Sequence, residues 1–144
     1  MSITTTTLAD DNFKVIIKAN GGSNEDKELL LDASKLNKAT ASPNVSIASV
    51  HHEILGTGKI TLFFDAQTNE EIATTFSGRG NYGLKKDEPK IKQGDTGATL
   101  INPTGDILLS TDSNVSKYNI LIEFRKEKGF TNGWYSFKFN NYRH

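Results

Sequence analysis

The residues of this chain that could do chemistry include two adjacent histidines in an expected strand. Neighbouring side chains of a strand point to opposite faces, so His51 and His52 do not converge on one metal ion. Glu53 shares the side of His51, which leaves two ligands at most in this stretch. We therefore expect no metal site here, and histidines that are solvated or lie at the edge of the core.

Two glycine-rich runs have partial matches to cofactor motifs. Residues 78–83 (GRGNYG) have the spacing of a dinucleotide-binding fingerprint, which requires a strand before it and a helix N-terminus after it. The residues that follow are few, charged and closed by Pro89, so a glycine-rich loop is the better interpretation. Residues 56–59 (GTGK) lack the first glycine and the final hydroxyl of a phosphate loop and are interpreted as a turn.

Neighbouring carboxylates occur in or beside three expected loops, at Asp10-Asp11, Glu70-Glu71 and Asp87-Glu88. Acid–base catalysis needs two carboxyl groups that converge on one substrate, and adjacency in sequence does not provide this. The chain also has no Gly-x-Ser-x-Gly nucleophile elbow. The sequence predicts a protein that is not an enzyme, with no catalytic, cofactor-binding or metal-binding residues.

Most of the chain has the period-two alternation of β-strands. In the clearest run, 118–126, apolar side chains share one face, and Leu121 is the single apolar residue on the other. Similar runs cover residues 12–18, 45–55, 59–65 and 71–76. We predict about eight short strands and little helix, that is, an all-β, single-domain antiparallel β-sandwich or barrel-like fold.

The connections carry further expectations. Residues 56–58 and 112–114 have turn compositions and are predicted to close β-hairpins, or a close relative of one in the second case. The apolar face switches near Ala48-Ser49, which predicts a one-residue bulge. Residues 27–38 fit a short helix or a strand closed by one helical turn, capped by Asp32 or Ser34, and the surrounding β pattern favours the strand.

We divide the chain into residues 1–11, a flexible N-terminal arm or edge segment, residues 12–130, the β domain, and residues 131–144, an aromatic C-terminal strand or extension. Residues 77–99 are predicted to form a long loop rich in glycine and lysine. Aromatic side chains dominate interface energetics, although part of the tail is also suited to a core. The candidate protein-contact residues are Trp134, Tyr135, Phe130, Tyr142, Arg79, Tyr82, Lys85 and Lys86.

The composition limits the partners. The 144 residues include 17 basic and 17 acidic side chains, whereas a nucleic-acid binder usually carries a basic excess. No apolar run approaches the roughly 20 residues that span a bilayer, and the first residues lack the basic start and apolar core of a signal peptide. Without cysteine, disulfides and thiolate metal sites are excluded. We expect no nucleic-acid or membrane partner and no cofactor.

Several segments carry a resemblance in their order and spacing. They are the Lys/Leu/Asp run at 27–36, the block 63–66 (FFDA), the glycine-rich stretch near Gly78 and, above all, residues 104–111 (TGDILLST) with 118–126. Together they resemble small virion structural proteins of tailed bacteriophages, especially those of marine bacteria. The likeness covers residues from about 12 to 130, and residues 131–144 depart from it.

The resemblance implies a β-sheet capsid decoration (cement) protein that binds and stabilises the assembled phage head. Such a protein is made in the bacterial host cytoplasm and is found on the capsid surface of the virion. Its partner would be the major capsid protein, and it would be a homo-oligomer, for example a trimer.

Two alternatives remain open. A tail-, neck- or fibre-associated subunit would share this fold and composition. A carbohydrate-binding β-sandwich module would use Trp134 or Tyr135 to stack on sugar faces. A hydrolase would need convergent polar residues, which the sequence does not indicate.

Overall fold

The computed structural model describes residues 3–68, 70–83, 88–97 and 100–131. Within these ranges the chain forms nine strands and one 3₁₀ turn. They are β1 (Thr4–Asp10), β2 (Lys14–Gly22), β3 (Glu28–Leu31), η1 (Ala33–Lys35), β4 (Val45–Gly56), β5 (Lys59–Thr68), β6 (Glu71–Ser77), β7 (Arg79–Tyr82), β8 (Ile101–Thr111) and β9 (Val115–Lys126).

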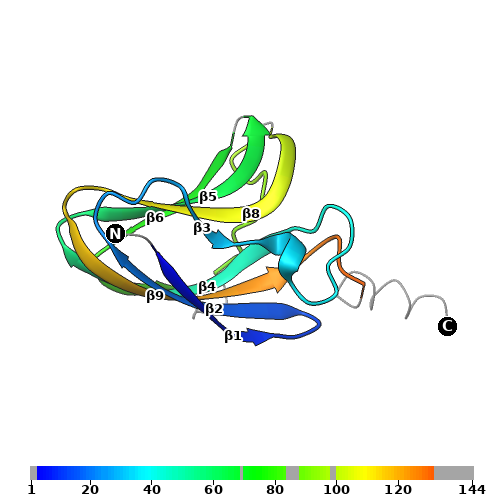
Figure 1. Ribbon diagram of the computed structural model, residues 1–144, viewed down its shortest axis with the longest axis horizontal. Helices are drawn as coiled ribbons and strands as arrows, with labels where there is room; N and C mark the ends of the chain where they lie inside the picture. Colours follow the sequence, from blue (N-terminus) through cyan, green and yellow to red (C-terminus); the bar gives the residue numbers. More distant parts are fainter. Residues whose placement is uncertain (1–2, 69, 84–87, 98–99, 132–144) are drawn as a thin grey trace.

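The strands build two antiparallel sheets that pack face to face (Figure 1). The five-stranded sheet has the order β1-β2-β9-β4-β7, and the four-stranded sheet has the order β3-β8-β5-β6. The predicted antiparallel β-sandwich is confirmed. From β2 to β9 the chain passes back and forth between the sheets, with β2 paired to β9 and β3 paired to β8. Eight strands wound in this way form a jelly roll.

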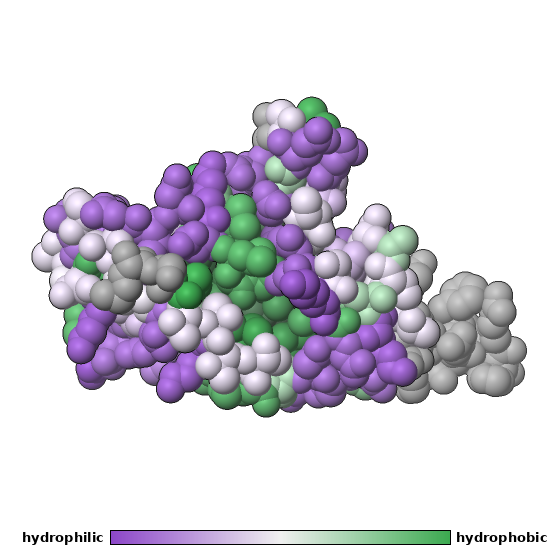
Figure 2. All heavy atoms as spheres, in the orientation of Figure 1, coloured by the Kyte–Doolittle hydropathy of each residue, from purple (hydrophilic) through white to green (hydrophobic). Residues whose placement is uncertain are grey.

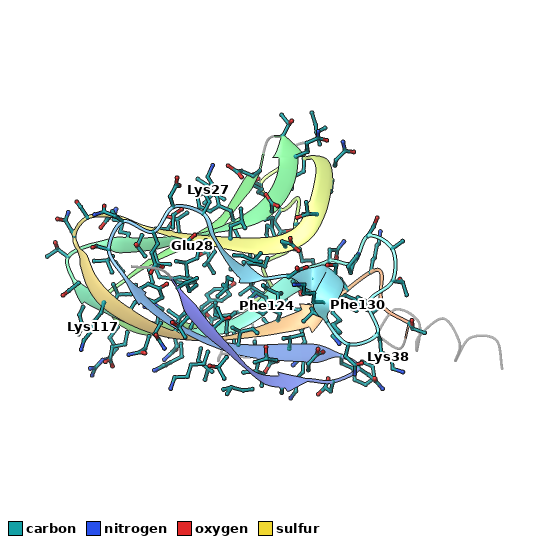
Figure 3. All side chains as sticks on the ribbon, viewed as in Figure 1. Lys27, Glu28, Lys38, Lys117, Phe124 and Phe130 are labelled. Atoms are coloured by element: carbon teal, nitrogen blue, oxygen red, sulfur yellow. The ribbon has the colours of Figure 1, made fainter. Side chains whose placement is uncertain are left out.

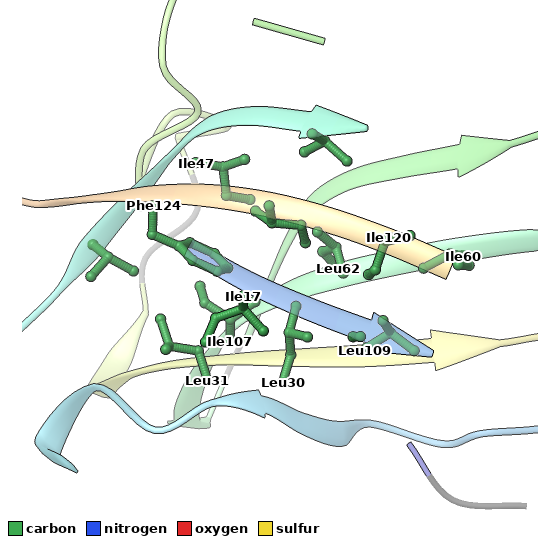
Figure 4. Close-up of a cluster of buried hydrophobic side chains, with 14 of the residues drawn as sticks. Ile17, Leu30, Leu31, Ile47, Ile60, Leu62, Ile107, Leu109, Ile120 and Phe124 are labelled. Atoms are coloured by element: carbon green, nitrogen blue, oxygen red, sulfur yellow. The ribbon is translucent and has the colours of Figure 1, made fainter. Parts of the chain in front are cut away.

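The core lies between the sheets and is almost entirely hydrocarbon. Side chains of both inner faces interdigitate there, as Figure 4 shows for Ile47, Leu62, Ile107, Leu109 and Phe124. Burying such a side chain stabilises the fold by about 1.5–3 kcal/mol. Figure 2 shows hydrophobic side chains at the centre of the face in view, in the gap between the two layers.

The alternation predicted for β9 is confirmed. Tyr118, Ile120, Ile122 and Phe124 are all buried, and Leu121 is 40% exposed on the outer face. Because this strand lies in the middle of its sheet, it brings one buried side chain to the core at every second position.

Two local predictions are also confirmed. The pairing of β4 with β9 shifts between Ile47 and Ser49, so the bulge falls on Ala48. The segment after residue 27 is strand β3 followed by the turn η1, not a longer helix. The carboxylate of Asp32 caps this turn, because its Oδ1 accepts a hydrogen bond of 3.1 Å from the amide of Ser34.

Both predicted hairpins are wrong. β4 and β5 lie in different sheets, and so do β8 and β9. Residues 56–58 and 112–114 are therefore corners that carry the chain from one sheet to the other. Turn composition specifies that the chain reverses, but not which sheet receives the next strand.

The two corners lie against each other. The amides of Thr57 and Gly58 donate hydrogen bonds of 3.1 and 3.2 Å to the carbonyl of Asn114. The amide of Lys59 donates to the carboxylate of Asp112 at 3.1 Å. A side chain at position 58 would overlap Asp112, so glycine is required at this close approach.

Two segments that the sequence suggested were irregular are strands. Residues Thr4–Asp10 form β1, which pairs with β2 and corresponds to the edge segment rather than to the flexible arm. Residues Arg79–Tyr82 form β7, which pairs with β4, so the long glycine-rich loop is interrupted by a short strand. Alternation was weak in both because neither strand buries a full face. In the described part of the chain, no helix is long and apolar enough to cross a membrane.

Candidate functional site

The two histidines lie on opposite faces of β4, as predicted. His51 is exposed on the outer face, whereas His52 is buried and its Nδ1 lies 2.9 Å from the carbonyl oxygen of Gly78. The His52 ring packs on the ring of Phe76, with 4.8 Å between centroids. Across the described ranges, no group of three or more His, Cys, Asp and Glu side chains is placed to hold a metal ion.

The first carboxylate pair serves the fold. Asp10 accepts a hydrogen bond of 2.6 Å from the buried ammonium of Lys126. The backbone amides of Phe13 and Lys14 donate to Asp11 at 2.8 and 2.9 Å and hold the pKa of this carboxyl below its usual value. The two groups thus bind different partners and do not converge on a substrate.

The second pair also divides its roles. Glu70 forms an ion pair with Lys27 at the surface, whereas Glu71 is buried. Glu71 accepts hydrogen bonds from the amides of Gly94 and Thr96 at 2.6 and 2.9 Å, and a third from the Thr96 hydroxyl. Burial opposes its ionisation, but the hydrogen bonds from Thr96 and Gly94 outweigh burial and lower the pKa of Glu71. This carboxylate fastens the segment at 92–97 to β6.

A buried polar network joins β2, β8 and β9. The Tyr118 hydroxyl and the Gly22 amide donate to the two carboxylate oxygens of Glu25. Thr111 Oγ1 accepts from the Glu25 amide at 2.9 Å and donates to the Gly22 carbonyl at 2.7 Å. Burial, and then the hydrogen bond and charge of Glu25, raise the pKa of Tyr118 far above its usual value. Because each side chain is already paired inside the protein, the network is suited to holding strands together.

The structure describes three of the predicted contact residues, and two of them, Arg79 and Tyr82, lie on the same strand, β7. Arg79 is exposed on β7 and lies 3.0 Å from a carboxylate oxygen of Glu53. Tyr82 is half-buried, and its hydroxyl donates to the carbonyl of Pro89 at 2.7 Å. Five further candidates lie outside the described residues, namely Lys85, Lys86, Trp134, Tyr135 and Tyr142.

Phe130 is a core residue rather than part of an exposed contact patch. It is only 5% exposed and belongs to the hydrophobic cluster between the sheets. Its ring also lies 5.1 Å from the ammonium of Lys126. The residue bridges to Ala39, a pairing between distant segments that the sequence did not indicate.

The outer face of the four-stranded sheet carries an apolar row that the sequence analysis missed. Leu29 on β3, Leu108 on β8, Phe63 on β5 and Ile72 on β6 are successive cross-strand partners, so the row crosses the whole sheet. Its ends are open, with Leu29 47% and Ile72 55% exposed, and its two middle members are half-buried. The sequence signal for this row was an apolar residue at an outward-facing strand position, such as Phe63 next to Phe64. Recognising that four such residues form a row also requires the pairing register of the strands.

A charged side chain crosses the middle of the apolar row. Lys27 lies with its ammonium 5.5 Å from the centre of the Phe63 ring and pairs with Glu70 (Figure 3 labels Lys27). One flank of the row is hydroxylic, with Thr61 opposite Ser110.

The other flank of the row is acidic. Burial, with the nearby carboxylates of Asp32 and Asp65, raises the pKa of Asp106 there. An apolar centre with a polar rim is the usual anatomy of a protein–protein contact surface.

A polar cleft lies at another edge of the molecule. Two hollows of about 370 Å³ each share Asn44 and Gln93. The side-chain oxygen of Gln93 is buried there and has no hydrogen-bond partner among the described residues. Neither hollow is lined by a described aromatic side chain, and the two aromatic residues named for sugar stacking, Trp134 and Tyr135, lie outside the described residues.

Comparisons with known proteins give only distant likenesses. No known protein family matches the chain, and no curated protein shows a significant sequence match. Among solved structures it is similar to peruvianin-I, a cysteine peptidase from Thevetia peruviana latex, with TM-score 0.43 and 7% identity, over 89% of this chain and 64% of that one. It is also similar to a cupin domain from Bordetella pertussis Tohama I, with TM-score 0.37 and 7% identity, over 88% of this chain and 94% of that one. Likenesses at this level carry no functional argument.

Proposed function

We propose that this protein is a virion structural protein of a tailed phage, a decoration protein that binds the assembled head through the apolar row. The observation that supports this proposal is the row itself, which crosses all four strands of one outer face. The buried carboxylates Glu25 and Glu71, by contrast, are hydrogen-bonded within the fold. The jelly roll is also one of the architectures that viral capsid proteins use, although a fold does not fix a function.

The row is suited to binding a surface that exists only after the phage head has assembled. Its exposed ends, Leu29 and Ile72, are already about half buried, so each would gain about 0.7–1.5 kcal/mol on full burial against a partner. The Lys27 side chain, which pairs with Glu70, lies against Phe63 near the centre of the row and covers part of its apolar surface in the isolated protein. A protein that binds only the assembled head stabilises that head by mass action.

Binding to phage heads that lack this chain tests the proposal. The double variant Leu29→Gln with Ile72→Gln should bind about tenfold or more weakly, because both open ends of the row lose their apolar contact. Leu121→Gln is the matched control, since Leu121 is 40% exposed on the outer face of the other sheet. Equal binding by the double variant and the wild-type protein would refute the proposed surface.

A tail or neck subunit is the second candidate, and it would use the same row against a different partner. Binding to isolated tails, with the same loss in the double variant, would support this alternative. Retained binding to heads would reject it.

A further inference from the structure

We propose that β1 is a self-association edge, at which two copies of this chain pair their β1 strands antiparallel about a two-fold axis. The two five-stranded sheets would then become one continuous sheet. This inference rests on the edge of the sheet alone and is independent of the proposed phage function.

The outer edge of β1 is exposed. β1 ends the order of its sheet and, among the described strands, pairs only with β2. Its register with β2 is regular from Thr4 to Thr7 and shifts at Leu8, so four consecutive residues present a straight outer edge. All four threonine side chains are exposed. The outward backbone N–H and C=O groups of such an edge are a template for another strand.

The strands at the other three sheet ends, β3, β6 and β7, differ from β1 in length, charge or covering. β3 and β7 have four residues each, and β7 carries Arg79. β6 is longer, but Ala73 forms a bulge within it and Glu71 at its start binds the segment that contains Gly94. Short length, charge, bulges and covering segments are the usual protections of sheet edges. The stretch Thr4–Thr7 is as short as β3 and β7 and ends at the bulge at Leu8, but it carries no charge, has no bulge within it and is not covered by another described segment.

The partner that fits the edge of β1 is a second copy of this chain. A two-fold antiparallel pairing brings the same edge together from both copies, so it is self-complementary. Threonine is favourable in strands, and Thr–Thr cross-strand pairs contribute to sheet stability. The formal net charge of the chain is zero, so no net repulsion opposes the approach of two copies.

The affinity of the dimer depends on the area that the β1–β1 seam buries. A seam of four residues per copy buries less than the roughly 1,000 Å² typical of a stable interface. The dimer should therefore be weak and should dissociate on dilution.

Charge substitutions at Thr5 test the pairing. Thr5 lies within the regular stretch, and its cross-strand partner in β2, Ala19, is uncharged. The proposed pairing places the two-fold axis at Thr5, so the two copies of this residue are direct cross-strand partners. Thr5→Lys alone and Thr5→Glu alone should each weaken the dimer by about tenfold, whereas an equal mixture of the two should restore it as a heterodimer.

Sedimentation velocity of the full chain, from micromolar to millimolar protein, provides the measurement. Thr75→Lys is the control, because Thr75 is also exposed on an edge strand, β6, and should leave the dimer unchanged. Equal thermal unfolding midpoints would show that the variants are folded. A wild-type protein that is monomeric throughout, a dimer that Thr5→Lys does not weaken, or a mixture that stays monomeric would each overturn the proposal.

Discussion

The ammonium of Lys126 lies 2.6 Å from a carboxylate oxygen of Asp10, a residue 116 positions earlier in the chain. The same nitrogen donates to the carbonyl oxygens of Asp11 and Asn37 at 2.6 and 2.8 Å. The Lys126 side chain is completely buried, and its three protons have three acceptors. One cation thus joins the end of β9 to the turn after β1 and to the segment after η1.

Lys126→Met should lower the free energy of unfolding by about 3–5 kcal/mol, because the Asp10 carboxylate loses its cation and keeps only the Asn37 amide as a donor, and two carbonyl groups lose this donor. Urea unfolding at neutral pH measures this change. Lys117→Met on the same strand is the control, since Lys117 is exposed, and it should change the stability by less than about 0.5 kcal/mol. Similar effects of the two substitutions would contradict a structural role for Lys126.

Tyr118→Phe should cost about 1.5–3 kcal/mol at neutral pH, because Glu25 loses a buried hydrogen-bond donor. A second effect follows from the raised pKa of Tyr118. This group stabilises the fold below its unfolded pKa of about 10, and the contribution is lost as the pH rises above that value. Wild-type stability should therefore fall more steeply than that of Tyr118→Phe between about pH 9 and about pH 11. Parallel pH profiles would show that the phenol titrates normally.

Glu71→Gln should release the segment at 92–97. Hydrogen exchange at the amides of Gly94 and Thr96 should accelerate by about tenfold or more, because the neutral side chain keeps one acceptor oxygen for the two amides and neither hydrogen bond is charge-assisted any longer. In the wild-type protein the lowered pKa of Glu71 means that this stabilisation is present above the unfolded value of 4.5 and is lost as the pH falls through the folded value. Glu70→Gln, at the adjacent surface position, should leave both amides protected. Unchanged exchange in Glu71→Gln would show that this carboxylate does not hold the segment.

Gly105→Ala should destabilise the protein more than Gly94→Ala. Both glycines have positive φ angles, +83° and +91°, so alanine is strained at either position by about 1 kcal/mol. A methyl group at position 105 would also overlap the carbonyl oxygen of Pro43, whereas position 94 opens into empty space. Overpacking of this kind adds about 1–3 kcal/mol. Equal shifts of the thermal midpoint would mean that the backbone near Pro43 yields without cost.

The strand pattern was readable from sequence where one face is buried and the other is wet. The alternation from Tyr118 to Phe124 and the bulge at Ala48 leave a local signature in the order of apolar residues. The corners at 56–58 and 112–114 do not, because a turn that joins two sheets and a turn that closes a hairpin use the same residue types. Whether such a turn is a corner or a hairpin depends on which strands pair, and strand pairing joins residues that are far apart in the chain.

The candidate surface was less predictable for the same reason. Leu29, Phe63 and Ile72 lie in three different strands and form one row only because β8 and β5 lie between the outer two. Phe130 has the aromatic character of a contact residue, but a distant pairing with Ala39 brings it into the core. Both outcomes depend on register, which sequence alternation alone does not fix.

The most direct test of the proposed function is the number of copies of this chain in purified virions of the phage that the proposal requires as its source, measured by quantitative mass spectrometry against the major capsid protein. A decoration protein bound over the whole head predicts a ratio near parity or a simple fraction of it. A few copies per particle would place the chain in the neck or tail instead. Absence from the virion would contradict the proposal that this jelly roll is a structural part of the particle.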